Sequence, residues 1–590
     1  MAGRGCRFRI RPVKGSPGAE TLEEERMRAR TTRRLAAALL VASLPAESAR
    51  AGQCHEVQDR VALAADPARA ARPIAPLLEG LGDHHHPVTT ASERAQAFFD
   101  QGLKLDYAFN HQEALRAFKE AARLDPDCAM AYWGWALVLG PNLNLPMKPE
   151  AVPQAFEAVQ KAMALRHTVS AKERAYIEAL ATRYASDPKA ERAPLDAAYA
   201  EAMKRVHEAY PDDPDAATVY ASALMNLSPW NYWTRDRQPR ERTPAILAAL
   251  EAALARDAKH EGALHYQIHA LEAADPDAAV PAADTLRGLA PGAGHLVHMP
   301  SHIYMQIGRY ADAFEDNKRA ALADEGYLTQ CRAQGVYPLT YYPHNIHFLV
   351  WAGIMQGRAR EALEASRRVA LKVPADFRED NWALYQTLVS QPLYVMARFG
   401  QWDAILAEPQ PPEAVRFHRG MSHWARGLAF AHTGRADDAR AELAALARIQ
   451  EDPKTPEVLV GFSNAATLLT LAREVLSGEI AARERRFDAA VAHLDRAVRL
   501  EDSLAYSEPP DWYYPTRHNL GAALLDAGRA VEAEVVYWQD LRRYRDNGFA
   551  LIGLAQSLRA QGRAAEADDA EKRYRAAWRD ADAPLTSSRF

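Results

Sequence analysis

Residues 102–126 read GLKLDYAFNHQEALRAFKEAARLDP, and this stretch decides the fold. Its first residue, Gly102, is followed by Ala114, Phe118, Ala121 and Pro126, at intervals of 12, 4, 3 and 5 residues. Small residues at such positions let two helices approach closely, an aromatic ring fills the gap between them, and a proline ends the second helix. The stretch therefore predicts a helix–turn–helix unit.

These intervals resemble those of the tetratricopeptide repeat (TPR), a helix–turn–helix unit of 34 residues. A further part of that pattern, a turn glycine followed five residues later by a close-packing alanine, occurs at Gly308, Gly357, Gly434, Gly528 and Gly562. The last two glycines are 34 residues apart (562 − 528). Weaker copies are expected in residues 129–290. Since one unit cannot bury its apolar face alone, the resemblance implies an all-α, right-handed superhelical solenoid with a concave inner groove.

The chain of 590 residues divides into five predicted segments. Four arginines in residues 28–34, a ten-residue apolar stretch in residues 35–44 and the small-residue pattern at 49–51 have the order of a signal peptide. We therefore assign residues 27–51 to a signal peptide, which predicts a periplasmic or secreted protein, and residues 1–26 to an extension upstream of the true start at Met27. Residues 52–91 are an N-terminal extension with a histidine-rich loop, residues 92–580 the solenoid and residues 581–590 a tail.

Composition narrows the classes of function. A formal net charge of -5 does not indicate a nucleic-acid partner or an anionic membrane surface. No apolar run reaches the roughly 18 residues that a membrane-spanning helix needs. The four cysteines contain no CxxC pair, which excludes a thiolate zinc knuckle, and they are too few in so long a chain for a disulfide scaffold. A phosphate-binding loop, a nucleophile elbow and an HExxH zinc-protease motif are absent from the sequence.

Histidines are concentrated in one part of the predicted solenoid. Eight of the 20 histidines lie in residues 260–347, where an even spread would place about three. Each turn glycine is taken as position 15 of its unit; the unit before that of Gly308 lacks one and is aligned by its offset of 33 residues (298 − 265; 302 − 269). Seven of the histidines then occupy positions 2, 5 and 9, which face the groove in TPR families. These are His265 and His269 (positions 5 and 9), His295, His298 and His302 (positions 2, 5 and 9), and His344 and His347 (positions 2 and 5).

Spacings of three and four residues place these side chains on one face of each helix. Equivalent positions on neighbouring helices lie about 10 Å apart, so the HxxxH pairs are expected to converge on one or two metal ions. Neutral imidazoles without thiolates and with few carboxylates favour copper or zinc over magnesium, calcium or manganese. Export would suit copper, so copper is favoured over zinc or iron. Such helix pairs resemble, in ligand chemistry only, the coupled dicopper centres of oxygen-binding proteins. Weaker candidate ligands are His84, His85, His86, His260 and His518.

Aromatic residues supply a candidate substrate pocket. Trp133 falls at position 5 of its unit and Trp351 at position 9, while Tyr341 and Tyr342 precede a helix beside a proline. Such residues wall a pocket or only pack the repeat. Residues 139–147 break the helical pattern, and we expect them to form a loop over one edge of the groove.

Several short stretches resemble a group of poorly characterised bacterial exported TPR proteins. They are LGDHHHPVTT (81–90), FDQGL (99–103), YAFNH (107–111), AMAYWG (129–134) and HMPSH (298–302). This resemblance implies the fold and export, and it implies no particular activity.

Three functions therefore remain open at the level of the sequence. The first is a metalloprotein with its histidines in the groove, in its sharper form a copper-dependent oxidoreductase acting on a small molecule. The second is a scaffold whose groove binds a peptide or a partner helix without metal. The third is a zinc-dependent hydrolase.

Overall fold

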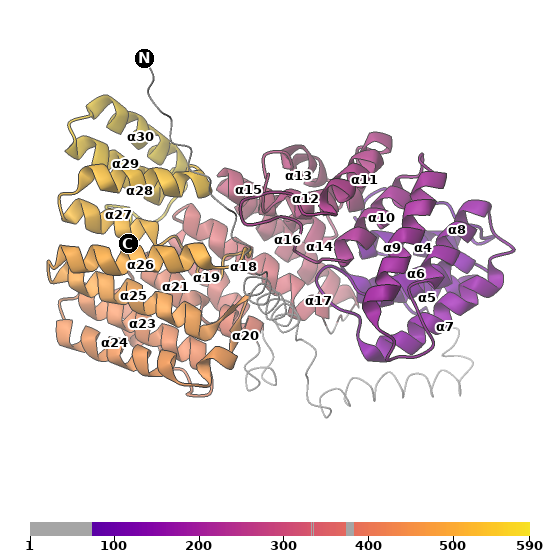
Figure 1. The fold of residues 1–590 in the computed structure, drawn as a ribbon, viewed down its shortest axis with the longest axis horizontal. Helices are drawn as coiled ribbons and strands as arrows, with labels where there is room; N and C mark the ends of the chain where they lie inside the picture. The colour runs from indigo at the N-terminus through magenta and orange to yellow at the C-terminus, as the bar shows by residue number, and fades with distance from the viewer. Residues whose placement is uncertain (1–72, 332, 334–335, 373–382) are drawn as a thin grey trace, which may run out of the picture.

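Paired helices follow one another along the chain in the computed structural model, which describes residues 73–331, 333, 336–372 and 383–590 (Figure 1). The first half of the described chain contains α4 (Glu93–Tyr107), α5 (His111–Leu124), α6 (Ala129–Leu139), the 3-10 turn η1 (Pro149–Ala151), α7 (Val152–Leu165), α8 (Ala171–Ala181), α9 (Arg192–Ala209), α10 (Pro214–Asn226), α11 (Thr243–Arg256), α12 (Glu261–Leu271), α13 (Val280–Leu286), α14 (Gly294–His298), α15 (Pro300–Ile307) and α16 (Tyr310–Cys331).

The second half continues in the same manner. It contains α17 (Val336–Leu339), α18 (Tyr341–Met355), α19 (Ala359–Leu371), α20 (Ala383–Val389), α21 (Gln391–Arg398), α22 (Trp402–Ala407), α23 (Arg416–His432), α24 (Ala436–Glu451), the 3-10 turn η3 (Thr455–Glu457), the strands β1 (Leu459–Val460) and β2 (Ser463–Asn464), α25 (Ala465–Arg483), α26 (Phe487–Ser503), α27 (Arg517–Asp526), α28 (Ala530–Arg543), α29 (Gly548–Ala560) and α30 (Ala564–Ala577). The two strands pair antiparallel, with Leu459 opposite Asn464.

The turn glycines explain where the first helix of each unit ends. Gly308, Gly357, Gly434, Gly528 and Gly562 all have a positive φ, between 72° and 85°. Glycine takes this left-handed conformation without a Cβ clash, which is why it terminates helices. The predicted fold class, an all-α TPR-like solenoid, is confirmed.

The close-packing residues act as the pattern predicts. The ring of Phe118 lies between Gly102 on α4 and Gly134 on α6, and a Cβ on either glycine would approach that ring to 2.6 or 2.3 Å. Tyr537 on α28 lies in the same way between Gly521 and Gly553, with approaches of 2.4 and 2.2 Å. Helices of one unit and the next therefore meet through a shared aromatic ring at both ends of the solenoid.

The C-terminal units contact the middle of the chain. Figure 1 shows α4–α11 at one end, α25–α30 at the other, and α14–α18 between them. Tyr310 on α16 donates a hydrogen bond to the carbonyl of Arg545 at 2.8 Å, and Tyr513 donates to the carbonyl of His347 on α18 at 2.7 Å. The second contact places the loop of residues 504–516, between α26 and α27, against α18. This loop contributes to the site described below.

The predicted tail is packed into the fold. Ser588 is fully buried, and Arg589 is 5% exposed. The hydroxyl of Ser588 donates to the carbonyl of His518, and the carbonyl of Arg589 accepts from Arg398 at 3.0 Å. Residues 1–72, which include the predicted signal peptide and the upstream extension, lie outside the described residues.

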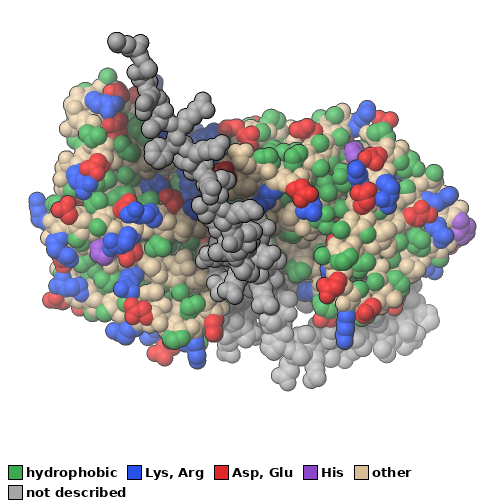
Figure 2. Space-filling view, in the orientation of Figure 1, with side chains coloured by type: hydrophobic (Ala, Val, Ile, Leu, Met, Phe, Trp, Pro, Cys, Tyr) green, Lys and Arg blue, Asp and Glu red, His purple; other side chains and the backbone are tan. Residues whose placement is uncertain are grey.

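The surface carries mixed charge. Figure 2 shows acidic and basic side chains interspersed over both ends of one face. Within the described residues, no helix is both long and apolar enough to cross a membrane. That nucleic acid is not a partner rests on net charge and stays a prediction.

Candidate metal centre

Six histidines from four helices meet at one place in the middle of the solenoid. We call them the central histidine cluster: His265 and His269 on α12, His295 and His298 on α14, His302 on α15 and His344 on α18. Pro300 begins α15 directly after α14, because proline has no N–H to continue the hydrogen-bond ladder. The ladder of helical hydrogen bonds is therefore interrupted at Met299, between His298 and His302.

The cluster consists of two trios. In the first, the ring of His265 lies 4.8 Å from that of His269 and 5.0 Å from that of His295, measured between centroids. In the second trio, His298 lies 4.8 Å from both His302 and His344. In each trio one ring nitrogen per histidine lies within 4.8 Å of the other two.

The two trios adjoin one another. The rings of His269 and His302 are 5.4 Å apart, and those of His295 and His298 are 5.6 Å apart. Both trios follow one rule of the repeat: positions 5 and 9 of one unit are joined by position 2 of the next. The third unit ends the series, because Trp351 stands at position 9 where a histidine would be needed.

Oxygen atoms around the cluster hold the Nδ1 side of three rings. Nδ1 of His265 donates to the Tyr107 carbonyl at 2.6 Å, and Nδ1 of His269 donates to Oε1 of Glu272 at 3.2 Å. Nδ1 of His298 faces Oδ1 of Asn317 at 2.7 Å, while the Asn317 amide nitrogen donates to Ser301 at 2.8 Å. Carbonyl and carboxylate oxygens only accept, so each ring carries its proton on Nδ1 and a lone pair on Nε2.

The Nε2 atoms face inward. Within the described part of the chain, Nε2 of His265, Nε2 of His269 and both ring nitrogens of His295 have no hydrogen-bond partner. Nε2 of His298 and Nε2 of His302 face each other at 2.9 Å. Buried polar atoms are ordinarily satisfied, so several inward lone pairs at one place indicate a ligand.

Burial keeps most of these imidazoles neutral. It lowers the pKa of His265, His269, His295, His298 and His344 well below the usual value, and neighbouring histidines lower each further. Neutral imidazole is the form that binds metal.

His302 is the exception. Burial lowers its pKa, but the Glu272 and Glu508 carboxylates outweigh that effect and raise the pKa to about 10. Nδ1 of His302 lies 2.6 Å from Oε2 of Glu272 and 2.7 Å from Oε2 of Glu508. Without another cation at the site, His302 is therefore the charged member of the cluster.

Aromatic residues enclose the first trio. The ring of Phe109, in the turn between α4 and α5, lies 4.3 Å from His265 and stacks on His269 at 5.8 Å. Its backbone φ is 56°, a left-handed conformation that non-glycine residues rarely adopt and that is found at functional sites. Trp230 approaches His269 edge-on at 5.0 Å, and Tyr341 approaches His295 at 5.0 Å.

The predicted loop at residues 139–147 reaches this wall. Its Asn144 donates to the hydroxyl of Tyr341 at 3.0 Å and accepts from the indole of Trp230 at 3.2 Å. One amide therefore links both aromatic rings beside the first trio.

The cluster is not on an open groove, which differs from the prediction. His265, His269, His295, His298 and His302 are at most 4% exposed, and only His344 is partly exposed. The physical reason is the fold-back of the chain: the 504–516 loop and the α4–α5 turn, more than 100 residues from the cluster on either side, cover it.

Two predicted ligands lie outside the trios. His347 stacks on Tyr513 at 5.1 Å, and His518 lies between Arg398 and Asp540, with Nε2 2.8 Å from the Asp540 carboxylate. Neither belongs to a group of three potential ligands within the described residues. His347 differs from the prediction because position 5 of the third unit faces the C-terminal units that fold back onto it.

Of the four predicted pocket residues, some lie near the central histidine cluster and others lie away from it. Tyr341 lies beside the cluster, and Trp351 lines a cavity of about 250 Å³ with Gln306 and Tyr506. Trp133 packs edge-on against Tyr176 at 5.5 Å in the core, and Tyr342 donates to Glu325 at 2.6 Å, away from the cluster. Position 5 of an early unit is therefore a packing position here.

The histidine-rich loop belongs to a second site. His84 and His86 lie with His260 around the carboxylate of Asp215, whereas His85 points outward and pairs with Asp100 at 2.7 Å. The side chain of His85 is 57% exposed. The loop and the central cluster are therefore separate groups.

Sequence reasoning missed the oxygen-bearing partners and the covering residues. Glu272 follows α12 three residues after His269, a spacing that would have signalled a contact on the same helix face. Glu508 and Phe109 carry no such signal, because only tertiary contacts bring them to the cluster.

Comparison with known proteins does not assign this chain to a family. No family model matches the chain, and no curated protein matches it. Among solved structures, the human IFIT1 dimer with m7Gppp-AAAA aligns over 83% of this chain and 91% of its own, at 12% identity and a TM-score of 0.30. The APC/C hetero-tetramer Cut9–Hcn1 aligns over 83% and 95%, at 13% identity and a TM-score of 0.26. The TPR domain of P58(IPK) aligns over 79% and 98%, at 14% identity and a TM-score of 0.21.

Proposed function

We propose that this protein is a metalloprotein whose central histidine cluster binds two transition-metal ions, one in each trio, with copper favoured. The observation that carries the proposal is the arrangement of the ring nitrogens. Nδ1 of His265, His269 and His298 is held by an oxygen acceptor, which leaves Nε2 turned inward as a lone pair. Metal-binding histidines have this outer hydrogen bond, which orients the ring and strengthens the ligand.

The donor set favours copper or zinc over magnesium and calcium, and the proposed export favours copper of these two. Each trio offers three imidazole nitrogens, which suit copper and zinc and do not suit magnesium or calcium, and in the second trio a bound cation would replace the proton of His302. Two such trios with rings 5.4–5.6 Å apart support a pair of ions rather than one. Ions in paired sites lie about 3.5–4 Å apart.

In the sharper form of the proposal the protein is an oxidoreductase acting on a small molecule. Copper supplies one-electron and oxygen chemistry, while the chain supplies binding and exclusion of water. Trp230, Asn144 and Tyr341 form a polar and aromatic wall beside the first trio. On the other side, Gln306 and Tyr506 contact Glu508 and also line the 250 Å³ cavity, which supports entry of a small substrate there.

The test is the metal content and spectrum of the chain from residue 52 onward, purified without a histidine tag. We expect two equivalents of copper. The variants His265→Ala/His269→Ala and His298→Ala/His302→Ala should each retain one. His347→Ala, which removes a buried histidine outside both trios, should retain two.

Electron paramagnetic resonance distinguishes a pair of adjacent copper ions from an isolated one. Two adjacent oxidised copper ions couple and give no signal, so each trio variant should gain the signal of an isolated ion. Zinc bound in place of copper would favour the hydrolase. Less than about a tenth of an equivalent after reconstitution, with folding verified by circular dichroism, would overturn metal binding and favour the peptide-binding scaffold.

Export remains part of the proposal. The order of basic, apolar and small residues in positions 27–51 supports it. Expression of the whole chain in a bacterium followed by N-terminal sequencing should find a mature chain that begins near residue 52. Retention of residues 1–26 in a cytoplasmic product would contradict both the signal peptide and the start at Met27.

A further inference from the structure

The cavity of about 250 Å³ near the second trio lies where separate parts of the solenoid meet. The 504–516 loop forms one wall, and α28 with the following Tyr544 forms another. Gln306 on α15 and Trp351 on α18 come from the central helices, and Arg237 comes from the connection between α10 and α11. Cavities between separate parts of a fold are common ligand sites.

This cavity is connected to the central histidine cluster by two sets of contacts. Gln306, which lines it, donates to Oε1 of Glu508, whose Oε2 lies 2.7 Å from Nδ1 of His302. The ring of Trp351 lies 5.7 Å from that of Phe348, which lies 4.7 Å from that of His302, measured between centroids. A molecule in contact with Trp351 would therefore be separated from the second trio by two side chains.

The charge at the cavity is predominantly positive. Three arginines line it: Arg237, Arg542 and Arg543. Within the described residues, Arg542 makes no hydrogen bond or ion pair, and Arg237 contacts only the carbonyl of Ala274, at 3.5 Å. Arg543 lies 3.5 Å from Asp502. Two guanidinium groups at the cavity thus have no carboxylate partner.

The two carboxyl groups that line the cavity are bonded to other parts of the chain. Oε2 of Glu501 accepts the backbone N–H of Thr516 at 2.8 Å, and Oδ2 of Asp511 accepts that of Phe462 at 3.1 Å. Burial raises the pKa of both groups, to about 6 for Asp511. Neither forms an ion pair within the described part of the chain, so the arginines set the charge of the cavity.

Aromatic rings form the apolar part of the lining. Trp351 and Trp512 are each 1% exposed, and Tyr544 is 4% exposed. Among the described residues, the indole N–H of Trp512 has no hydrogen-bond partner. A buried donor without a partner at the wall of a cavity indicates an acceptor that the chain itself does not supply. Aromatic walls with a few polar groups are typical of small-molecule sites.

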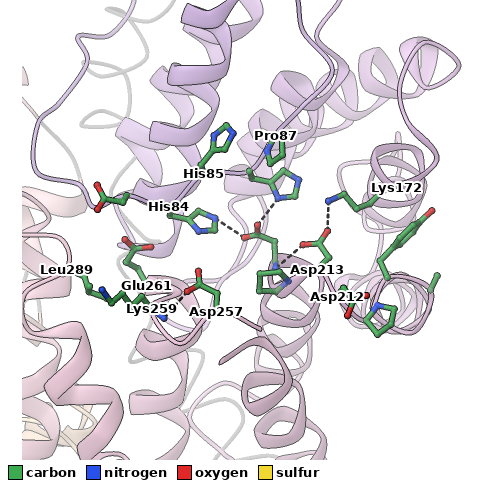
Figure 3. Close-up of a pocket in the computed structure, with 17 residues that line it drawn as sticks. His84, His85, Pro87, Lys172, Asp212, Asp213, Asp257, Lys259, Glu261 and Leu289 are labelled. Carbon is green, nitrogen blue, oxygen red and sulfur yellow. Dashed lines mark hydrogen bonds and ion pairs between the residues drawn. The ribbon is translucent and has the colours of Figure 1, made fainter. Parts of the chain in front are cut away.

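A second cavity, a cleft of about 760 Å³ at the histidine-rich loop, has the opposite charge (Figure 3). Six carboxylates line it: Asp83, Asp212, Asp213, Asp215, Asp257 and Glu261. Its two lysines are Lys172 and Lys259, and Figure 3 shows Lys172 paired with Asp213, at 3.0 Å. An anionic ligand is therefore expected in the smaller cavity and not in this cleft, because like charges repel.

We propose that the cavity of about 250 Å³ binds a small aromatic carboxylate, with the arginines at its carboxylate and the tryptophans against its ring. Guanidinium groups bind carboxylates through charge-assisted hydrogen bonds, and tryptophan offers a large planar contact. The cavity has the volume of roughly eight water molecules, which suits a single substituted ring. This ligand is the substrate class of the oxidoreductase only if the proposed function holds, whereas its binding does not require metal.

The test is isothermal titration calorimetry of the full mature chain with benzoate, first as purified and then after removal of metal by a chelator. We expect one equivalent to bind in both forms, because none of the lining residues belongs to the central histidine cluster. Benzyl alcohol, which lacks the carboxylate, and inorganic phosphate, which lacks the ring, should each bind about 10–100-fold more weakly. Equal binding of either one would overturn the ligand class.

Variants of the lining locate the binding site. Arg237→Gln/Arg542→Gln should lower the affinity for benzoate about 10–100-fold and leave that for benzyl alcohol unchanged, a difference that a folding defect would not produce. Trp512→Phe, which keeps an aromatic ring but removes the N–H, should weaken benzoate binding about tenfold. Lys259→Gln is the matched control: it removes an exposed cation from the acidic cleft and should change nothing.

Copper content separates this site from the proposed function. The double arginine variant should retain the two equivalents of copper of the unchanged chain. Benzoate binding in a chain that takes up no copper would support the site and remove the oxidoreductase. Two equivalents of copper without benzoate binding, or equal benzoate affinity in the double arginine variant and the unchanged chain, would overturn the site alone.

Discussion

One carboxylate serves both trios of the central cluster. Glu272 accepts from Nδ1 of His269 through one oxygen and lies 2.6 Å from Nδ1 of His302 through the other. It is 2% exposed. Glu272 therefore fixes the orientation of one ligand in each trio.

The first prediction concerns the charge of this residue. Glu272→Gln keeps the size of the side chain but removes the anion that the two rings face. We expect affinity for copper to fall about 10–100-fold in a competition titration, as is usual for an outer hydrogen-bond partner. Glu251→Gln on the exposed face of α11 is the matched control, and equal affinity in both variants would contradict the role of Glu272.

At the scale of elements, the repeat itself builds the site twice. Positions 5 and 9 of one first helix and position 2 of the next meet in both trios, although 26 residues separate positions 9 and 2 in the first trio (295 − 269) and 42 in the second (344 − 302). Gly308, which ends α15 with a φ of 85°, is the turn glycine between the ligands of the second trio.

A second prediction tests the turn. At Gly528, φ is 74° and an added Cβ would meet nothing within 4 Å, so backbone strain is the only cost of an alanine there. We expect Gly528→Ala to lower the free energy of unfolding by about 1–2 kcal/mol. Gly288→Ala has equally open surroundings without a positive φ and should change stability by less than about 0.5 kcal/mol. Urea unfolding of both variants measures the difference, and equal midpoints would contradict the strain.

At the scale of the whole molecule, the C-terminal tail completes a buried ion pair. Arg589 lies 3.6 Å from the fully buried carboxylate of Glu479 on α25 and 2.9 Å from Asp526 on α27. The tail therefore stabilises the C-terminal units that fold back over the central helices.

Removal of this arginine gives a third prediction. Arg589→Ala leaves Glu479 buried without its main cation, and we expect a loss of about 3 kcal/mol in the free energy of unfolding. Arg529→Ala breaks the exposed pair with Glu532 and should cost less than about 1 kcal/mol. Equal losses in urea unfolding would show that the tail pair is no stronger than a surface pair.

The same pair predicts a dependence on acid. Burial raises the pKa of Glu479, but Arg589 and His432 outweigh it and lower the pKa to about 2, below its ordinary 4.5. A carboxyl group with a lowered pKa stabilises the fold above its ordinary pKa, and the contribution disappears as pH falls from 4.5 towards 2. The stability difference between the unchanged chain and Glu479→Gln should shrink over that window, and a constant difference would refute the assignment.

The fold and the histidines of the central cluster could be predicted from the sequence, but from different features of it. The turn glycines and close-packing alanines are local features, so their recurrence predicted the solenoid and the register of its first helices. That register in turn placed His265 beside His269 and predicted that they meet the pair at His298 and His302. The register alone does not reveal that the C-terminal units cover the position of His347.

What the sequence by itself determined is the repeat, its period and the face of each helix that carries histidine, because all three depend on spacing within about 34 residues. Only the tertiary structure decided that the cluster is enclosed, that Glu508 and Phe109 border it, and that His84 and His86 meet Asp215 129–131 residues away (215 − 86; 215 − 84). The reason is physical: these contacts depend on how the stacked units curve and fold back, and that curvature is the sum of packing at many interfaces rather than a property of any one segment.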